Sequence, residues 1–237
     1  MLAASVVWAR MTWSKPLFIL FVVTVGWTVS LFIAPLTIAP GTFAYTTGGA
    51  NLVDHWAIYQ QPAFNWYAKV IYVVGDAQCH QLYYRSLWID GNQMPIDARM
   101  TSMYIFGIFG LVWAMMTPPA ATASEGIVNA FPSRIQRWAR KIGVVRFAGL
   151  VVVLGLLPVA VDGFSQLFAA YTSYESTNFT RVVTGISSGL ITGLLLGMMI
   201  MSIKQLDIEI ARMRALREGN SATGELQTSP TPGSSEP

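Results

Sequence analysis

Four long apolar segments constrain the fold of this 237-residue chain more than any other feature. They cover residues 17–39, 100–117, 147–168 and 182–203. Because about 20 apolar residues span the roughly 30 Å hydrocarbon core of a bilayer, each segment is long enough to cross a membrane as a helix. Charged residues make up only 11% of the chain, against about 25% in soluble domains. The sequence therefore predicts an all-α membrane protein, a four-transmembrane-helix bundle embedded in the lipid bilayer.

Basic residues predict the orientation of these helices, since short cytoplasmic loops are enriched in Lys and Arg. Eleven of the fifteen basic residues fall in segments that four spans place on one side: Arg10, Lys15, Arg134, Arg137, Arg140, Lys141, Arg146, Lys204, Arg212, Arg214 and Arg217. We therefore expect a multi-pass protein of the plasma membrane with both termini in the cytoplasm. The first segment is longer than a signal-peptide core of roughly 7 to 15 residues, which favours a retained helix over a cleaved signal.

The segments outside the four spans differ in character. Residues 40–98 form the largest outer segment, and their many aromatic residues suit the membrane interface. We expect a short interfacial helix over about 52–74 and a turn at Asp90-Gly91.

The two ends of the chain are expected on the inner side. Residues 1–16 form a cytoplasmic N-terminus. Residues 204–218 predict an amphipathic helical extension of the fourth span, and residues 219–237 have the Ser, Thr, Pro and Gly content of a disordered tail.

The fourth span carries glycine at every fourth position, in Gly185, Gly189, Gly193 and Gly197. This spacing puts the glycines on one helix face, where another helix can approach closely. The partner is either a helix of the same chain, which we favour, or a second copy in a homo-oligomer. Nucleic acid is not an expected partner, because the basic residues follow the membrane topology and form no separate basic domain.

Several polar residues are expected at the outer end of the bundle, where ionisable groups are costly by about 2.5–3.5 kcal/mol at membrane depth. Asp162 follows an apolar run that begins at Phe147, which places it in the outer leaflet. The same level should hold Asp97, Arg99, Gln166, Glu175, Asn178 and Arg181, and the outer segment adds Cys79, His80, Gln81 and Arg85. These residues form either a site open to the outer face or a salt-bridge network that pins the helix ends.

Three motifs carry a family resemblance: "CHQLYYRSLWIDGNQMPIDARMTSMYIFGIFG", "DGFSQL" and "ESTNFTRVVTG". Over about residues 66–200 the chain resembles the prokaryotic integral membrane family called domain of unknown function 2085. The resemblance implies a multi-spanning protein in the plasma membrane of a bacterium or archaeon, and it implies no activity.

The chain departs from the pattern of this family at two positions. The family usually has a cysteine where Asp97 stands, and often a Cys or an Asp where Met100 stands. Cysteines at these positions would predict a metal site with thiolate ligands or a redox-active cysteine pair. Asp97 and Met100 weaken that prediction for this chain.

Three functions fit these residues. The first is binding or transport of a polar or anionic small ligand by Gln81, Arg85, Arg99, Gln166, Glu175, Asn178 and Arg181. The second is a membrane enzyme whose candidate catalytic residues are His80, Cys79, Asp97 and Asp162, with a divalent metal at Cys79, His80 and Asp97 as one form of it. The third is a structural or assembly subunit. The chain has neither the HExxH motif of metalloproteases nor a Walker phosphate loop.

The pair Cys79-His80 yields the most specific expectation. A free outer thiol is an oxidation liability, so we expect both side chains to point inward. His80 should then hydrogen-bond Asp97, Asp162 or Glu175.

Overall fold

A computed structural model describes residues 4–49, 51–167 and 175–227. Four of its helices are long and apolar enough to cross a membrane: α2 (Lys15–Ile33, continued by the 3-10 turn η1, Ala34–Thr37), α5 (Ala98–Met116), α8 (Val144–Leu167) and α10 (Asn178–Gln227). They coincide with the four apolar segments of the sequence. The prediction of an all-α membrane protein with four spans is therefore confirmed.

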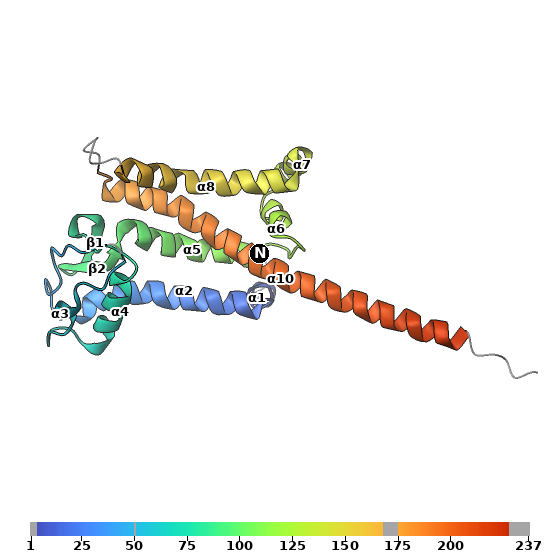
Figure 1. The fold of residues 1–237 in the computed structure, drawn as a ribbon, viewed down its shortest axis with the longest axis horizontal. Helices are drawn as coiled ribbons and strands as arrows, with labels where there is room; N and C mark the ends of the chain where they lie inside the picture. The colour runs from blue at the N-terminus through green and yellow to red at the C-terminus, as the bar shows by residue number, and fades with distance from the viewer. Residues whose placement is uncertain (1–3, 50, 168–174, 228–237) are drawn as a thin grey trace, which may run out of the picture.

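The helices α5 and α10 form the centre of the bundle, with α2 along one side of the pair and α8 along the other (Figure 1). The glycine face of α10 lies against α5. A Cβ atom at Gly189 would overlap the backbone of Met103, and one at Gly193 would overlap the backbone of Gly107. Only glycine permits this approach. The partner of the glycine face is thus a helix of the same chain, and a second copy has no room there.

Residues 34–49 and 51–97 form a compact unit at one end of the bundle, which we call the cap (Figure 1). Its elements after η1 are α3 (Trp56–Tyr59), α4 (Trp66–Asp76), η2 (Tyr83–Arg85), β1 (Ser86–Ile89) and β2 (Asn92–Asp97). The expected single helix over 52–74 is wrong, since the chain forms two helices with Pro62 between them. A proline restricts the residue before it to extended conformations, which ends a helix.

The two strands of the cap form an antiparallel hairpin, which the sequence analysis did not predict. The expected turn at Asp90-Gly91 closes it. Both residues have positive φ, 51° and 72°, as a two-residue hairpin turn requires.

The aromatic residues of the cap divide into two groups. Phe43, Tyr59, Phe64 and Tyr72 are at most 3% exposed and pack their rings against one another. Others remain on the surface: Tyr45, Trp56, Trp66, Tyr84 and Trp88. Part of the aromatic content expected at the membrane interface therefore forms the core of a folded unit instead.

The opposite end of the bundle, which we call the basic end, carries three short helices: α1 (Ala4–Met11), α6 (Ala123–Asn129) and α7 (Ser133–Ile142) (Figure 1). The helix α10 continues beyond this end through Gln227. The expected tail boundary at residue 219 is therefore too early. Residues 228–237 of that tail lie outside the described residues.

Replacing Gly193 with alanine should destabilise the bundle by about 1–3 kcal/mol, because the new methyl group meets backbone atoms of α5 that cannot move aside. The matched control is Gly149→Ala in α8, where nothing lies within 4 Å of the new atom. This control should be neutral or stabilising by up to about 1 kcal/mol through helix propensity. Unfolding of both variants in detergent measures the difference, and equal effects would contradict the close packing of α5 and α10.

Candidate functional site

Polar side chains from three helix ends meet where the bundle joins the cap. We call this set the cap-end network. Arg99 comes from the first turn of α5, Asp162 and Gln166 from the last turns of α8, and Arg181 from the first turn of α10. Its other members are Arg85, Asp97, Glu175, Ser176 and Asn178.

Asp162 is the buried acid of the network, with an exposed fraction of 5%. Its carboxylate forms an ion pair with Arg99. It also accepts hydrogen bonds from Ser176 Oγ at 3.1 Å and from Gln166 Nε2 at 3.2 Å. These contacts compensate the carboxylate, because a buried charge needs a counterion and hydrogen bonds.

Arg181 is the buried base of the network and is only 2% exposed. Its Nε donates to the carbonyl oxygen of Ser176 at 3.2 Å, and its Nη2 donates to Gln166 Oε1 at 2.9 Å. Its Nη1 lies 3.8 Å from Asp97 Oδ2. Asp97 also caps α5, since its Oδ1 accepts a hydrogen bond from the Met100 amide at 2.7 Å.

Two further contacts join the network to the cap. Arg85 donates through Nε and Nη2 to Glu175 Oε1, both at 3.1 Å, at the exposed rim. Asn178 Nδ2 donates to the carbonyl oxygen of Ser86 at 3.2 Å. The network therefore contains three guanidinium groups and three carboxylates, so its formal charges balance.

The side chains of Cys79 and His80 lie in different environments. Cys79 is 4% exposed, and its Sγ accepts a hydrogen bond from the Asp97 amide at 3.3 Å. Burial of the thiol raises its pKa most, and the negative charge of Asp97 raises it further, to about 11. His80 is exposed, and its side chain makes no hydrogen bond to the described residues. The expected contact of His80 with Asp97, Asp162 or Glu175 is therefore wrong, and Cys79, His80 and Asp97 do not converge on a metal.

Gln81 explains why the two side chains diverge. It has a positive φ of 48°, which turns the chain just after His80. Its side chain is fully buried in the cap, where Nε2 donates to the carbonyl oxygens of Tyr72 and Pro95 and Oε1 accepts from Tyr59. The protein thus satisfies the polar atoms of Gln81, which leaves this expected ligand-binding residue none to offer a ligand.

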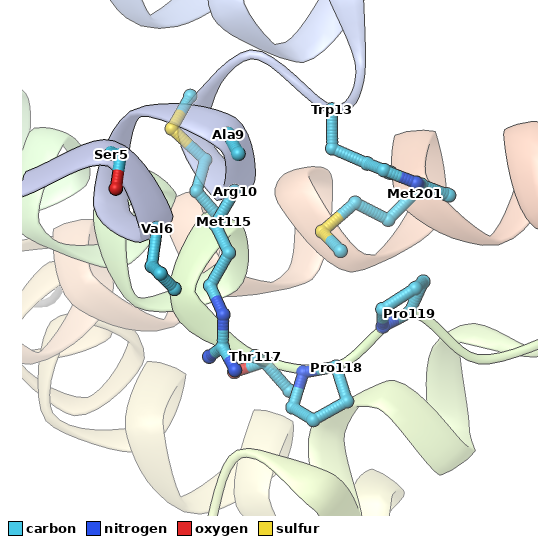
Figure 2. Close-up of a pocket in the computed structure, with 10 residues that line it drawn as sticks. All are labelled: Ser5, Val6, Ala9, Arg10, Trp13, Met115, Thr117, Pro118, Pro119 and Met201. Carbon is cyan, nitrogen blue, oxygen red and sulfur yellow. The ribbon is translucent and has the colours of Figure 1, made fainter. Parts of the chain in front are cut away.

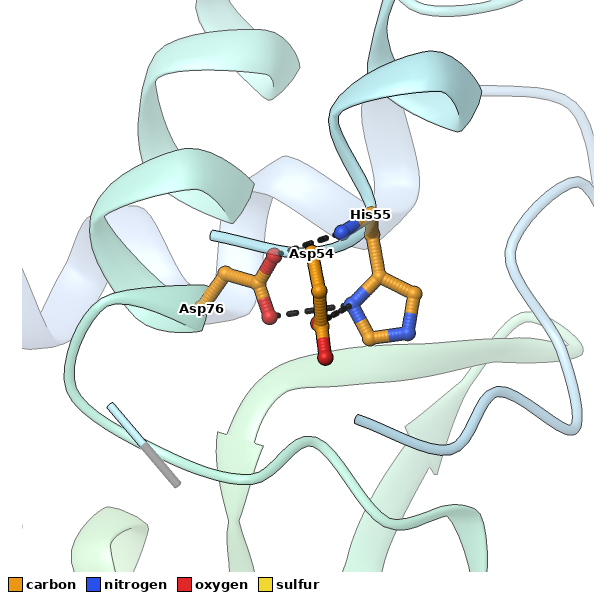
Figure 3. A group of neighbouring side chains, drawn as sticks. All are labelled: Asp54, His55 and Asp76. Atoms are coloured by element: carbon orange, nitrogen blue, oxygen red, sulfur yellow. Dashed lines mark hydrogen bonds and ion pairs between the residues drawn. The ribbon is translucent and has the colours of Figure 1, made fainter. Parts of the chain in front are cut away.

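The other histidine forms a cluster that the sequence analysis did not find (Figure 3). His55 Nδ1 lies 2.9 Å from Asp76 Oδ1 and 3.1 Å from Asp54 Oδ1. The hydrogen bond to Asp76 raises the pKa of His55, against the lowering effect of burial. The adjacent Asp54-His55 is a signal that could have been noticed, but Asp76 lies too far along the chain for a spacing motif.

Two apolar cavities lie elsewhere in the bundle. One of about 340 Å³ lies between α2, α5 and α10, beside Thr24, Tyr104 and Thr192. The other, of about 470 Å³, lies at the basic end and is lined in part by Arg10 of α1 (Figure 2). Arg10 Nη1 donates a hydrogen bond to the carbonyl oxygen of Met116 at 2.7 Å. Neither cavity is lined by a residue of the cap-end network.

Replacing Asp162 with asparagine should destabilise the protein by about 3–5 kcal/mol, because it leaves the Arg99 guanidinium without its counterion in a buried position. Asp90→Asn is the matched control, since Asp90 is exposed in the hairpin turn and asparagine tolerates its positive φ. Thermal unfolding in detergent should show a clear loss for the first variant only. Similar small losses in both would mean that Asp162 is hydrated.

The thiol of Cys79 should react slowly with iodoacetamide in the folded protein. With a pKa of about 11, about one thiol in a thousand is a thiolate at pH 8, and the rate should rise about tenfold per pH unit up to pH 10. The control places a thiol at the exposed neighbour, as His80→Cys in a Cys79→Ser background, and should react far faster. Fast labelling of native Cys79 at pH 8 would contradict its burial.

Comparison with known proteins places the network in a family. The family described as "Predicted membrane protein (DUF2085)" matches residues 79–195, a range that runs from Cys79 into α10 and holds every residue of the network. Neither the curated proteins nor the solved structures contain a match to the chain. Residues 79–195 thus match the model of the predicted membrane proteins of domain of unknown function 2085, the family that the sequence resembles.

Proposed function

We propose that this protein binds a polar or anionic small ligand at the cap-end network, as a membrane binding protein or transporter. The observation that carries the proposal is the convergence of Arg85, Arg99 and Arg181 on one site where three helices end. A guanidinium group presents a planar fork of donors that matches carboxylate and phosphate oxygens. Charged groups that face the interior of a membrane bundle commonly mark ligand or ion sites.

Two unpaired polar atoms support a ligand at this place. Among the described residues, the donor Arg99 Nε and the acceptor Asn178 Oδ1 are buried without a hydrogen-bond partner. A buried polar atom without a partner costs about 1–3 kcal/mol. A ligand that offers one acceptor and one donor would remove both costs, and this favours binding over an inert network.

The two alternative functions have less support. An enzyme that uses Cys79 and His80 together requires side chains that meet, whereas Cys79 is buried and His80 faces outward. A purely structural role uses the same ion pairs as the proposed site, because they also tie α5, α8 and α10 together. The test must therefore distinguish ligand binding from a structural role in which the ion pairs only hold the helix ends together.

We also propose that the cap faces the outside of the cell. The eleven basic residues of the expected inner side lie in α1, in α7, in the first turns of α2 and α8 and in α10 from Lys204 onward, all away from the cap. The His80→Cys variant checks this orientation with a membrane-impermeant maleimide, which should label it in intact cells. Labelling only after permeabilisation would reverse the orientation.

The ligand-binding proposal predicts that a small anion or zwitterion raises the melting temperature of the purified protein. The probes are inorganic phosphate, succinate and glycine, each compared with sodium chloride at equal ionic strength. A ligand present at 100 times its Kd should stabilise the protein by about 2.7 kcal/mol. If none of the three probes stabilises the protein beyond chloride, the structural alternative replaces the proposal.

A conservative variant separates the two roles. Arg99→Lys keeps a positive charge for Asp162 but removes the Nε donor and the planar fork, so the stabilisation by the probe should disappear. Arg140→Lys is the matched control, because Arg140 forms an exposed ion pair with Glu125 at the basic end. This control should keep the full response to the probe. An undiminished response in Arg99→Lys would exclude Arg99 from the site.

A further inference from the structure

The cluster of Asp54, His55 and Asp76 in the cap brings three ligand-type side chains to one point (Figure 3). His55 Nδ1 and one oxygen of each carboxylate all lie within 4.8 Å of one another. With bonds of about 2.0–2.2 Å, two ligand atoms on one zinc ion lie at most about 4.4 Å apart. A shift of a few tenths of an ångström would therefore bring the three atoms into one coordination sphere.

The charges of the cluster do not balance within the protein. Asp76 is fully buried at the last residue of α4, where the negative end of the helix dipole disfavours a carboxylate. In the described ranges, His55 is the only ion-pair partner of either aspartate. Even with His55 protonated, one negative charge remains. With His55 neutral, as a metal ligand must be, two negative charges remain, and one divalent cation would balance them.

The surroundings hold the cluster in position. The His55 ring is 6% exposed and packs edge-on against Phe43, with ring centroids 5.6 Å apart. Asp54 Oδ2 accepts a hydrogen bond from the Gly49 amide at 2.7 Å, and Asp76 Oδ2 accepts one from the His55 amide at 3.1 Å. Such outer contacts orient the ligands of metal sites.

Two more observations concern the residues around the cluster. A Cβ atom at Gly48 would lie 2.7 Å from His55 Cε1, 2.8 Å from Asp54 Oδ1 and 2.8 Å from the carbonyl oxygen of His80, so only glycine lets the chain pack this closely on the cluster. His55 Nε2 is buried and has no hydrogen-bond partner among the described residues. A histidine that ligates a metal through Nδ1 carries its proton on Nε2 and commonly turns it toward a backbone carbonyl.

We infer that Asp54, His55 and Asp76 bind one divalent transition-metal ion, with Zn²⁺ as the best match to one imidazole nitrogen and two carboxylate oxygens. The ion ties the loop that carries Asp54 and His55 to the end of α4. The side chain of Asp54 is 39% exposed, which gives the ion a route from solvent. The three residues precede the family-matched range, and the site is independent of the cap-end network.

Zinc binding to the purified protein tests this inference. The protein is prepared in detergent without a histidine tag, stripped with a chelator, mixed with ZnCl₂ and desalted, and the bound zinc is measured by elemental analysis. Wild type should retain one zinc ion per chain and should gain thermal stability with added zinc. Asp54→Asn and His55→Ala should bind zinc at least about tenfold more weakly, as loss of a ligand requires.

Two controls distinguish this site from the other candidate ligands of the cap. His80→Ala removes the exposed histidine and Cys79→Ser removes the buried thiol, and both should bind zinc as wild type does. Slow alkylation of Cys79 shows that the cap of each ligand variant is still folded. Zinc bound equally by wild type, Asp54→Asn and His55→Ala would overturn the inference. Wild type without zinc would also overturn it and leave a hydrogen-bonded His-Asp pair.

Discussion

The close approach of α5 and α10 is the constraint on which the rest of the structure depends. These helices run parallel, and small residues bring their backbones into contact at Gly189 and Gly193. Their first turns therefore lie at the same level, and each carries an arginine there, Arg99 and Arg181. Two guanidinium groups at one level repel each other, so carboxylates are needed there. Asp97 at the start of α5 supplies one, and Asp162 of α8 supplies another.

The same approach fixes the position of the cap. Asp97 starts α5 as its N-terminal capping residue, ends the hairpin and lies within 3.8 Å of Arg181. Its amide also donates to Cys79, which anchors the end of the loop that follows α4. One residue thus links a helix terminus, a strand, a buried thiol and a buried arginine. A substitution of Asp97 would therefore disturb the packing of the cap and the ion pairs of the network together.

Much of the fold follows from simple properties of the sequence. The four spans follow from apolar length. The partner of the glycine face was one of two alternatives in the sequence, and the structure resolves it in favour of α5. These features are predictable because they depend on helix geometry, which is regular.

The features that the sequence did not predict depend on irregular backbone. The direction of the His80 side chain is set by a turn with positive φ at Gln81, and no periodicity reports such a turn. The cluster at His55 depends on how α4 packs against the loop before α3, a tertiary contact between residues that lie far apart in sequence. The hairpin, in contrast, carries a signal in Asp90-Gly91, which predicts the turn but does not by itself predict the paired strands on either side.

The charge balance of the cap-end network depends on Asp97. Arg85, Arg99 and Arg181 face Glu175, Asp162 and Asp97, so the network is neutral as a whole. Without the carboxylate of Asp97, three guanidinium groups would face two carboxylates, and one positive charge would stay unbalanced beside the buried Arg181. Because an uncompensated buried charge is strongly destabilising, Asp97 stabilises the junction of the helices through this charge as well as through its cap on α5.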